Sequence, residues 1–316
     1  MGKQRKRKGD PVHGWLAVDK PVDMTSTQVV GRLRRLFNAQ KAGHGGTLDP
    51  LADGILPIAF GEATKTAQWA MDCDKEYVFT IEWGSSTASQ DKEGEVIARS
   101  DVRPSKSEIE SAVLGFIGDI EQIPPKYSAI KVGGERAYDL AREGETFEIA
   151  SRQVTVYEAE LVAIPDPDHA RFRVVSGKGF YIRALARDLA QALGAEGHVS
   201  QLRRTRVGAM DESCAVTLPA LEALAEADAE ASLFDTLLPL DLVLEDVPKL
   251  AIEARDAAAI KQGREITLMP HLVEQWRAEA DRDAMDRLAL TFCEGKAVAL
   301  GEVRAGRFQP KKVFQL

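Results

Sequence analysis

One aspartate, Asp49, stands in a loop that glycine and proline residues hold in place. The stretch from residue 43 to residue 57 reads GHGGTLDPLADGILP. The glycines before Asp49 permit close backbone approach and positive φ angles, and Pro50 biases Asp49 toward an extended conformation. The side chain is therefore oriented before a ligand arrives. A carboxylate held in this way is suited to act as a nucleophile or a base.

Three further motifs accompany this loop. They are Asp19-Lys20-Pro21 near the start, IPPKYSAIK at residues 123–131 and GKGFYIR at residues 177–183. Together with the Asp49 loop they resemble the bacterial tRNA pseudouridine-55 synthases, the TruB family, over most of the chain. The resemblance implies an α+β protein with a mixed, largely antiparallel sheet and flanking helices. It also implies isomerisation of uridine to pseudouridine in the tRNA T loop, without a cofactor.

The resemblance implies roles for individual residues of the active site. Asp49 would be the catalytic aspartate, and Arg183 would pair with it, because a cation favours the ionised carboxylate in a closed pocket. The ring of Tyr77 would stack on the target uracil. Tyr181 and Leu202 would form other walls of the pocket.

Contacts with RNA are implied as well, because a stacked uridine must be flipped out at a cost of roughly a few kcal/mol. His44 resembles the family histidine that stacks in place of the extruded nucleotide, and Asp91 resembles a polar contact to extruded nucleotides. Lys20, with Pro21, resembles the pair that supports the active-site loop. Phosphate contacts are expected from basic residues near these motifs: Lys126, Lys131, Arg203, Arg204 and Arg206.

Two other functions stay open. A nucleoside or glycoside hydrolase would use Asp49 with Asp53 or Asp91, since hydrolytic glycosidases generally need two carboxylates, and it would release free base or sugar. An RNA-binding or RNA-folding factor would need no chemistry from Asp49. For a synthase, three routes stay open: Asp49 attacks the base, attacks the ribose, or removes a ribose proton.

The distribution of charge permits RNA binding although the net charge is −8. Residues 207–248 contain ten Asp or Glu and no Lys or Arg, so the acidity is local. By contrast, residues 24–48 contain four Lys or Arg and no acid, and residues 152–206 contain nine against six acids. The basic segments could face phosphates, and we expect the acidic segment to point away from RNA.

Composition argues against a metal-binding, disulfide-bonded, secreted or membrane protein. The three cysteines and five histidines are scattered, so we expect reduced thiols and no metal site. The basic start is followed by no apolar run, and no apolar segment has membrane length. The glycine-rich loop lacks the Gly-Lys-Ser/Thr ending of a P-loop. We expect a monomeric cytoplasmic protein whose partner is the T-arm stem-loop of tRNA, with no obligate protein partner.

Three parts are predicted along the 316 residues. Residues 1–10 form a disordered basic tail, residues 11–246 a pseudouridine synthase catalytic domain, and residues 247–316 a small β-rich PUA-like RNA-binding domain. Hydrophobic periodicity and capping residues predict the elements. Strands are expected at 15–21, 77–83, 154–164, 170–176 and within 289–315, and helices after Thr25 or Ser26 and at 107–117, 137–142, 181–193 and 254–261.

Overall fold

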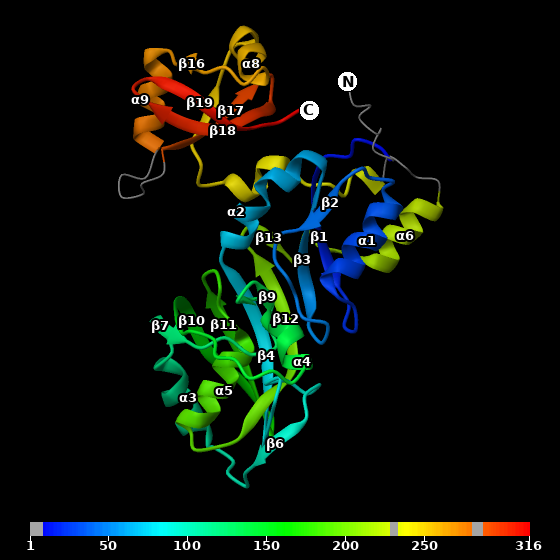
Figure 1. The fold of residues 1–316 in the computed structure, drawn as a ribbon, viewed down its shortest axis with the longest axis vertical. Helices are drawn as coiled ribbons and strands as arrows, with labels where there is room; N and C mark the ends of the chain where they lie inside the picture. Colours follow the sequence, from blue (N-terminus) through cyan, green and yellow to red (C-terminus); the bar gives the residue numbers. More distant parts are fainter. Residues whose placement is uncertain (1–8, 228–232, 280–286) are drawn as a thin grey trace.

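The computed structural model describes residues 9–227, 233–279 and 287–316. Most of the predicted basic tail, residues 1–8, lies outside this part of the chain. A ten-stranded sheet and a five-stranded sheet occupy different regions of the molecule (Figure 1). In the described residues, no helix is long and apolar enough to cross a membrane.

The ten-stranded sheet is mixed and largely antiparallel, as predicted. Its order is β14-β1-β3-β12-β4-β11-β10-β7, with β13 beside β12 and β2 beside β3. Only β1 with β14 and β3 with β12 pair in parallel. The strands are β1 (Gly14–Lys20), β2 (Ala42–His44), β3 (Asp53–Phe60), β4 (Lys75–Trp83), β7 (Gly118–Gln122), β10 (Arg152–Asp166), β11 (His169–Ser176), β12 (Gly197–Val207), β13 (Met210–Asp211) and β14 (Val216–Thr217).

Strands β3 and β12 run side by side over a short stretch, where Arg203 faces Asp53 and Arg204 faces Gly54. A Cβ atom at Gly54 would lie 2.2 Å from the Arg204 carbonyl oxygen, and the φ of Gly54 is +98°. Only glycine tolerates both conditions. Because Gly54 follows the Asp49 loop closely, this approach brings the loop against β12.

Helix α1 (Ser26–Leu36) begins with a capping box. The Thr25 side chain accepts a hydrogen bond from the Gln28 backbone, and the Gln28 side chain binds the Thr25 backbone, so Thr25 rather than Ser26 is the N-cap. Val29, Leu33 and Phe37 are buried as their spacing predicts.

One core joins the helices to the main sheet. It contains Val29 and Leu33 of α1, Phe79 of β4, and Leu185 and further apolar residues of α5 (Ile182–Ala192). The other helical segments are α2 (Ala67–Asp72), α3 (Lys106–Leu114), α4 (Ala137–Arg142), α6 (Leu218–Glu226) and the 3₁₀ turns η1 (Gly61–Thr66) and η2 (Leu240–Leu244). Helix α3 ends three residues before its predicted end, because the chain turns at Gly115 and leads into β7.

Two hairpins extend from the main sheet. One joins β5 (Ser85–Thr87) to β6 (Val96–Arg99), and the other joins β8 (Lys131–Val132) to β9 (Glu135–Arg136) and leads into α4. The second hairpin and α4 belong to residues 124–142, which we call the projecting segment.

The C-terminal part has its own five-stranded sheet, in the order β15-β17-β18-β19-β16. Its elements are β15 (Lys249–Ala251), α8 (Ala254–Lys261), β16 (Ile266–Thr267), α9 (Pro270–Glu279), β17 (Leu288–Cys293), β18 (Lys296–Arg304) and β19 (Arg307–Val313). Gly301 lies inside β18, where a Cβ atom would stand 2.6 Å from the Phe308 ring, so glycine permits tight packing there.

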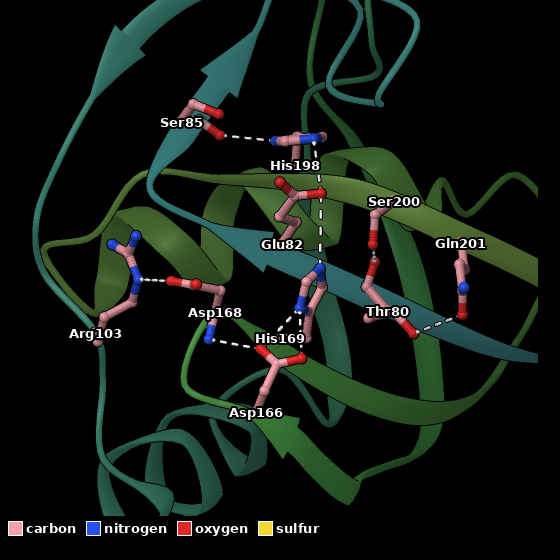
Figure 2. Close-up of polar contacts among 10 residues, drawn as sticks. All are labelled: Thr80, Glu82, Ser85, Arg103, Asp166, Asp168, His169, His198, Ser200 and Gln201. Atoms are coloured by element: carbon pink, nitrogen blue, oxygen red, sulfur yellow. Dashed lines mark hydrogen bonds and ion pairs between the residues drawn. The ribbon is translucent and has the colours of Figure 1, made fainter.

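A polar network ties together β4, β11 and β12 at the end remote from Asp49 (Figure 2). The Glu82 carboxylate lies between two imidazoles, 3.7 Å from His169 Nε2 and 3.8 Å from His198 Nε2. His169 Nδ1 lies 2.8 Å from the Asp166 carboxylate, and His198 Nδ1 lies 2.8 Å from the Ser85 carbonyl oxygen. The three strands are thus held in register by side chains as well as by backbone bonds.

Candidate active site

Most of the predicted catalytic and pocket residues meet around one small cavity of about 70 Å³. It lies between the Asp49 loop, β4, β12 and the start of α5. Its lining comprises Thr47, Leu48, Asp49, Tyr77, Phe180, Tyr181, Ile182, Arg183 and Leu202. Asp49, Tyr77, Tyr181, Arg183 and Leu202 are therefore brought together from four separate segments.

Asp49 forms an ion pair with Arg183. Its Oδ2 atom lies 2.9 Å from Arg183 Nη2, and the Asp49 side chain keeps 32% of its surface exposed while that of Arg183 keeps 5%. The carboxylate is thus reachable from solvent, and the cation behind it is not. A charge-assisted pair of this length fixes the orientation of the carboxylate.

Arg183 is itself fixed by three other groups. Its Nη1 donates to the Ser89 carbonyl (2.9 Å), and its Nη2 donates to the Tyr127 carbonyl (2.8 Å). Its Nη1 also lies 3.3 Å from Asp91 Oδ2. Tyr127 belongs to the projecting segment, so Arg183 links that segment to the catalytic loop.

Asp91 differs from its predicted role. Its residue is 3% exposed, and its carboxylate binds Arg183, the Ser89 hydroxyl (2.6 Å) and the Glu93 backbone N–H (3.0 Å). Asp91 therefore helps to hold Arg183 in the position from which it pairs with Asp49. In this arrangement it does not face an extruded nucleotide.

Arg204 was expected to contact phosphate, and its burial contradicts this. It is 2% exposed, and its guanidinium donates to the carbonyl oxygens of Ile55 (2.8 Å), Thr47 (3.2 Å) and Gly46 (3.3 Å). These carbonyls flank Asp49 on both sides. Arg204 therefore holds the catalytic loop against β12.

Helix α1 holds the same loop from the other side. The Ser26 hydroxyl donates to the Leu48 carbonyl (3.0 Å), and the Leu48 N–H donates back to that hydroxyl (2.9 Å). This reciprocal pair fixes the residue directly before Asp49. Nothing in the sequence distinguishes Ser26 from an ordinary helix-start residue, so the contact was missed.

Lys20 lies beside the loop, and its supporting role stays a prediction. It is fully buried, and its Nζ donates to the carbonyl oxygens of Met24 (2.7 Å), Pro21 (2.8 Å) and Pro50 (3.3 Å). Burial lowers the pKa of Lys20 to about 8, although the carboxylates of Asp53 and Asp49 raise it.

His44 lies on β2, outside the lining of the cavity. Burial lowers the pKa of its imidazole, and the Arg204 cation lowers it further. The ring is therefore neutral at pH 7, and its buried Nδ1 has no hydrogen-bond partner among the described residues. A neutral ring carries no charge to pair with a phosphate, and the stacking role of His44 stays a prediction.

The other four expected phosphate contacts differ in their partners. Arg206 donates to the Gly208 carbonyl (3.3 Å). Arg203 is bound by acids, 2.6 Å from Glu212, 3.0 Å from Asp19 and 3.2 Å from Asp53, so its charge is neutralised within the protein. Lys126 and Lys131 are exposed on the projecting segment and remain candidates for phosphate contacts.

A hydrolase would need a second carboxylate with access to the substrate. Neither candidate lines the cavity together with Asp49, because Asp91 is buried against Arg183 and Asp53 pairs with Arg203 outside the cavity lining. Asp49 is the one carboxylate in the cavity lining, which is otherwise largely apolar and aromatic, as a reaction that keeps its leaving group requires.

Family models match most of the chain. Residues 34–182 match the N-terminal domain of the TruB family of pseudouridylate synthases, and residues 183–245 match the C-terminal domain of tRNA pseudouridylate synthase B. The second match ends just before the five-stranded sheet begins.

Curated relatives match over nearly their whole length. The tRNA pseudouridine synthase B of Caulobacter vibrioides is 53% identical, and the match covers 99% of each chain. That of Rhizobium johnstonii is 47% identical over 99% of this chain and 100% of the relative.

A solved structure has the same fold. It is the Cbf5 complex with Nop10 and Gar1, in which one chain superposes with a TM-score of 0.71 and 26% identity, covering 99% of this chain and 91% of that one. The single carboxylate in the cavity lining, the family models and the full-length relatives agree, and we conclude that this chain belongs to the TruB family of pseudouridylate synthases.

Proposed function

We propose that this chain isomerises uridine 55 in the T loop of tRNA to pseudouridine, without a cofactor. The observation that carries the proposal is the 2.9 Å ion pair of Asp49 with the buried Arg183, in a cavity walled by Tyr77, Tyr181 and Leu202. The relatives named tRNA pseudouridine synthase B support the choice of substrate.

In the proposed reaction the N-glycosidic bond breaks, the uracil rotates within the pocket, and carbon 5 then bonds to the ribose. Asp49 starts the first step, either as a nucleophile toward the base or the ribose or as a base toward a ribose proton. Tyr77 stacks on the uracil, and its hydroxyl assists removal of the proton from carbon 5. Tyr181 and Leu202 keep water away from the detached base.

The free enzyme must open before a nucleotide enters. The cavity of about 70 Å³ is far below the roughly 300 Å³ at the lower end of small-molecule pockets. The flipped uridine enters the cavity and moves its walls apart. His44 then takes the place that the base leaves in the RNA. The exposed Lys126 and Lys131 then contact the RNA backbone.

The C-terminal part would add RNA affinity. We assign residues 11–246 to the catalytic domain and residues 247–316 to a PUA-like RNA-binding domain, on the basis of the separate five-stranded sheet that begins at Lys249. We propose a monomer that acts in the cytoplasm on tRNA without an obligate protein partner.

The test uses a T-arm stem-loop tritiated at carbon 5 of its uridines, because pseudouridine formation releases that tritium to water. The wild type and Asp49→Asn are compared, since asparagine keeps the size of the side chain and removes its charge. A stem-loop with cytidine at the target position is the matched RNA control.

We expect the wild type to release tritium and Asp49→Asn to release none. The release should require the target uridine and should give no free uracil. Free uracil would instead establish a hydrolase. Binding of the stem-loop without release would favour an RNA-folding factor.

A further inference from the structure

Arg152 is a cation without an acidic partner close to the cavity. Its Nε and Nη2 atoms are buried and have no hydrogen-bond partner, and no ion pair to its guanidinium is found in the described residues. Arg152 as a whole is partly exposed, but its two buried N–H groups would normally be paired, because removing polar groups from water is costly. Its surroundings must therefore compensate in another way.

The compensating group is the ring of Tyr181. The guanidinium carbon of Arg152 lies 5.0 Å from the centre of that ring, within the range of a cation–π interaction. Tyr181 lines the cavity beside Asp49 and Arg183. The contact thus ties a residue of β10, outside the cavity lining, to a wall of the cavity.

Gln122 holds the backbone of the same tyrosine. Its Oε1 accepts a hydrogen bond from the Tyr181 N–H (2.8 Å), and its Nε2 donates to the Tyr181 carbonyl (3.1 Å). Gln122 is fully buried and lies directly opposite Arg152 in the pairing of β7 with β10. Two adjacent side chains on neighbouring strands therefore fix one residue, one through its backbone and the other through its ring.

Tyr181 is the N-cap residue of α5, and its own side chain makes no capping bond. Arg183 follows two positions later. The amide of Gln122 thus also sets where α5 begins, and with it the place from which Arg183 reaches Asp49.

We propose that Gln122 and Arg152 are positioning residues that act on the reaction through Tyr181. Gln122 fixes the backbone of Tyr181 and the start of α5, and Arg152 fixes the plane of the tyrosine ring against the flipped base. The inference rests on the proposed function, since its effect is on the rate of pseudouridine formation.

The experiment is a double-mutant cycle on the single-turnover rate of tritium release from the T-arm stem-loop. Arg152→Met removes the charge and keeps a long apolar stem, and it is made in the wild type and in Tyr181→Leu. Arg152→Lys keeps the charge without the planar group. Arg103→Met is the matched control, because Arg103 forms an exposed ion pair with Asp168 at the remote end of the sheet (Figure 2).

Arg152→Met is expected to slow the wild type about tenfold and to change the Tyr181→Leu enzyme by less than about twofold, because coupled residues give non-additive effects. Arg152→Lys should recover part of the rate, and Arg103→Met should leave it unchanged. The affinity for the stem-loop should stay within about twofold, since Arg152 acts on the ring and not on the RNA.

An equal loss of rate in both backgrounds would overturn the inference, as would full activity of Arg152→Met. Unchanged thermal unfolding of Arg152→Met would separate the effect from a loss of folding. If the wild type released no tritium, the proposed function would fail, and that result is distinct from an additive cycle in an active enzyme.

Discussion

Asp49 and Asp91 are held by different nitrogen atoms of one guanidinium. Arg183 Nη2 lies 2.9 Å from Asp49, and Arg183 Nη1 lies 3.3 Å from Asp91. The two carboxylates differ in access, because the Asp49 side chain is 32% exposed and that of Asp91 is 4% exposed. One acid is therefore available to substrate while the other orients the cation.

Asp91→Asn tests this division of roles. Arg183 would lose its second charged partner and some of its orientation, so we expect the rate of pseudouridine formation to fall about tenfold. The Kd for the stem-loop should change less than about twofold, because the buried Asp91 does not touch RNA. Single-turnover rates and filter binding measure the two quantities.

Glu93→Gln is the matched control for this substitution, since it removes a nearby carboxylate that makes no ion pair with Arg183 in the described residues. A large rise in Kd for Asp91→Asn with little change in rate would restore the role of a contact to extruded nucleotides.

Arg204→Met should impair both stability and activity. It leaves the carbonyl oxygens of Gly46, Thr47 and Ile55 without their donor, and each unsatisfied buried group costs about 1–3 kcal/mol. We expect the Tm to fall by several degrees and the activity at a permissive temperature to be lost, because the Asp49 loop is released.

The control is Arg103→Met, because the ion pair of Arg103 with Asp168 lies at the end of the sheet remote from Asp49. If Arg204→Met kept its Tm and lost only RNA affinity, Arg204 would be a phosphate contact after all. Calorimetry and binding titration distinguish the outcomes.

Lys20 should give the activity an alkaline limit. Its pKa is about 8, lowered by burial, and its three recorded bonds to carbonyls require the three N–H groups of the ammonium form. As the pH rises from 7 to 9 the amine loses a donor, so we expect the rate to fall. The free energy of unfolding should instead rise with pH, because the unfolded lysine keeps its proton up to its ordinary pKa of 10.5.

A pH–rate profile tests this, with Lys20→Met expected to be slow at every pH and to lack the decline. Lys75→Met is the control, because burial also lowers the pKa of Lys75 to about 8 and this lysine is outside the cavity lining. A decline that vanished in Lys75→Met instead would assign the titration to Lys75.

His169 should stabilise the fold more at acidic pH. Its hydrogen bond to the Asp166 carboxylate raises the pKa of the imidazole above 6.5; partial burial opposes this, and the charges of Asp166 and Glu82 add to it (Figure 2). Because the folded-state pKa is the higher one, the stabilisation is complete below the unfolded pKa. It is lost as the pH rises through the folded one.

We therefore expect His169→Gln to lower the free energy of unfolding more at pH 5.5 than at pH 8, measured by urea denaturation. His271→Gln, at an exposed position of α9, is the control. An equal effect of His169→Gln at both values would show that the imidazole contributes only packing.

The sequence alone determined the local elements and the catalytic loop. These signals are carried by residues close together in the sequence. They are the cap at Thr25, the spacing of Val29 and Leu33, and the strand and helix patterns around Tyr77 and Arg183. The motif around Asp49 likewise lies within one short segment, and its order with the other motifs led to the family.

Only the tertiary structure decided what the charged side chains do. The motif context pointed to a surface role for Arg204, yet it is buried against carbonyls about 150 positions away, and Asp91 meets Arg183 of α5 from a segment distant in the sequence. Gln122 precedes a recognised motif and still gave no sign of its bonds to Tyr181, 59 positions along the chain. The same local sequence can place an arginine or an amide in solvent or in the interior. Its partner is set by strand pairing and not by its neighbours in the sequence.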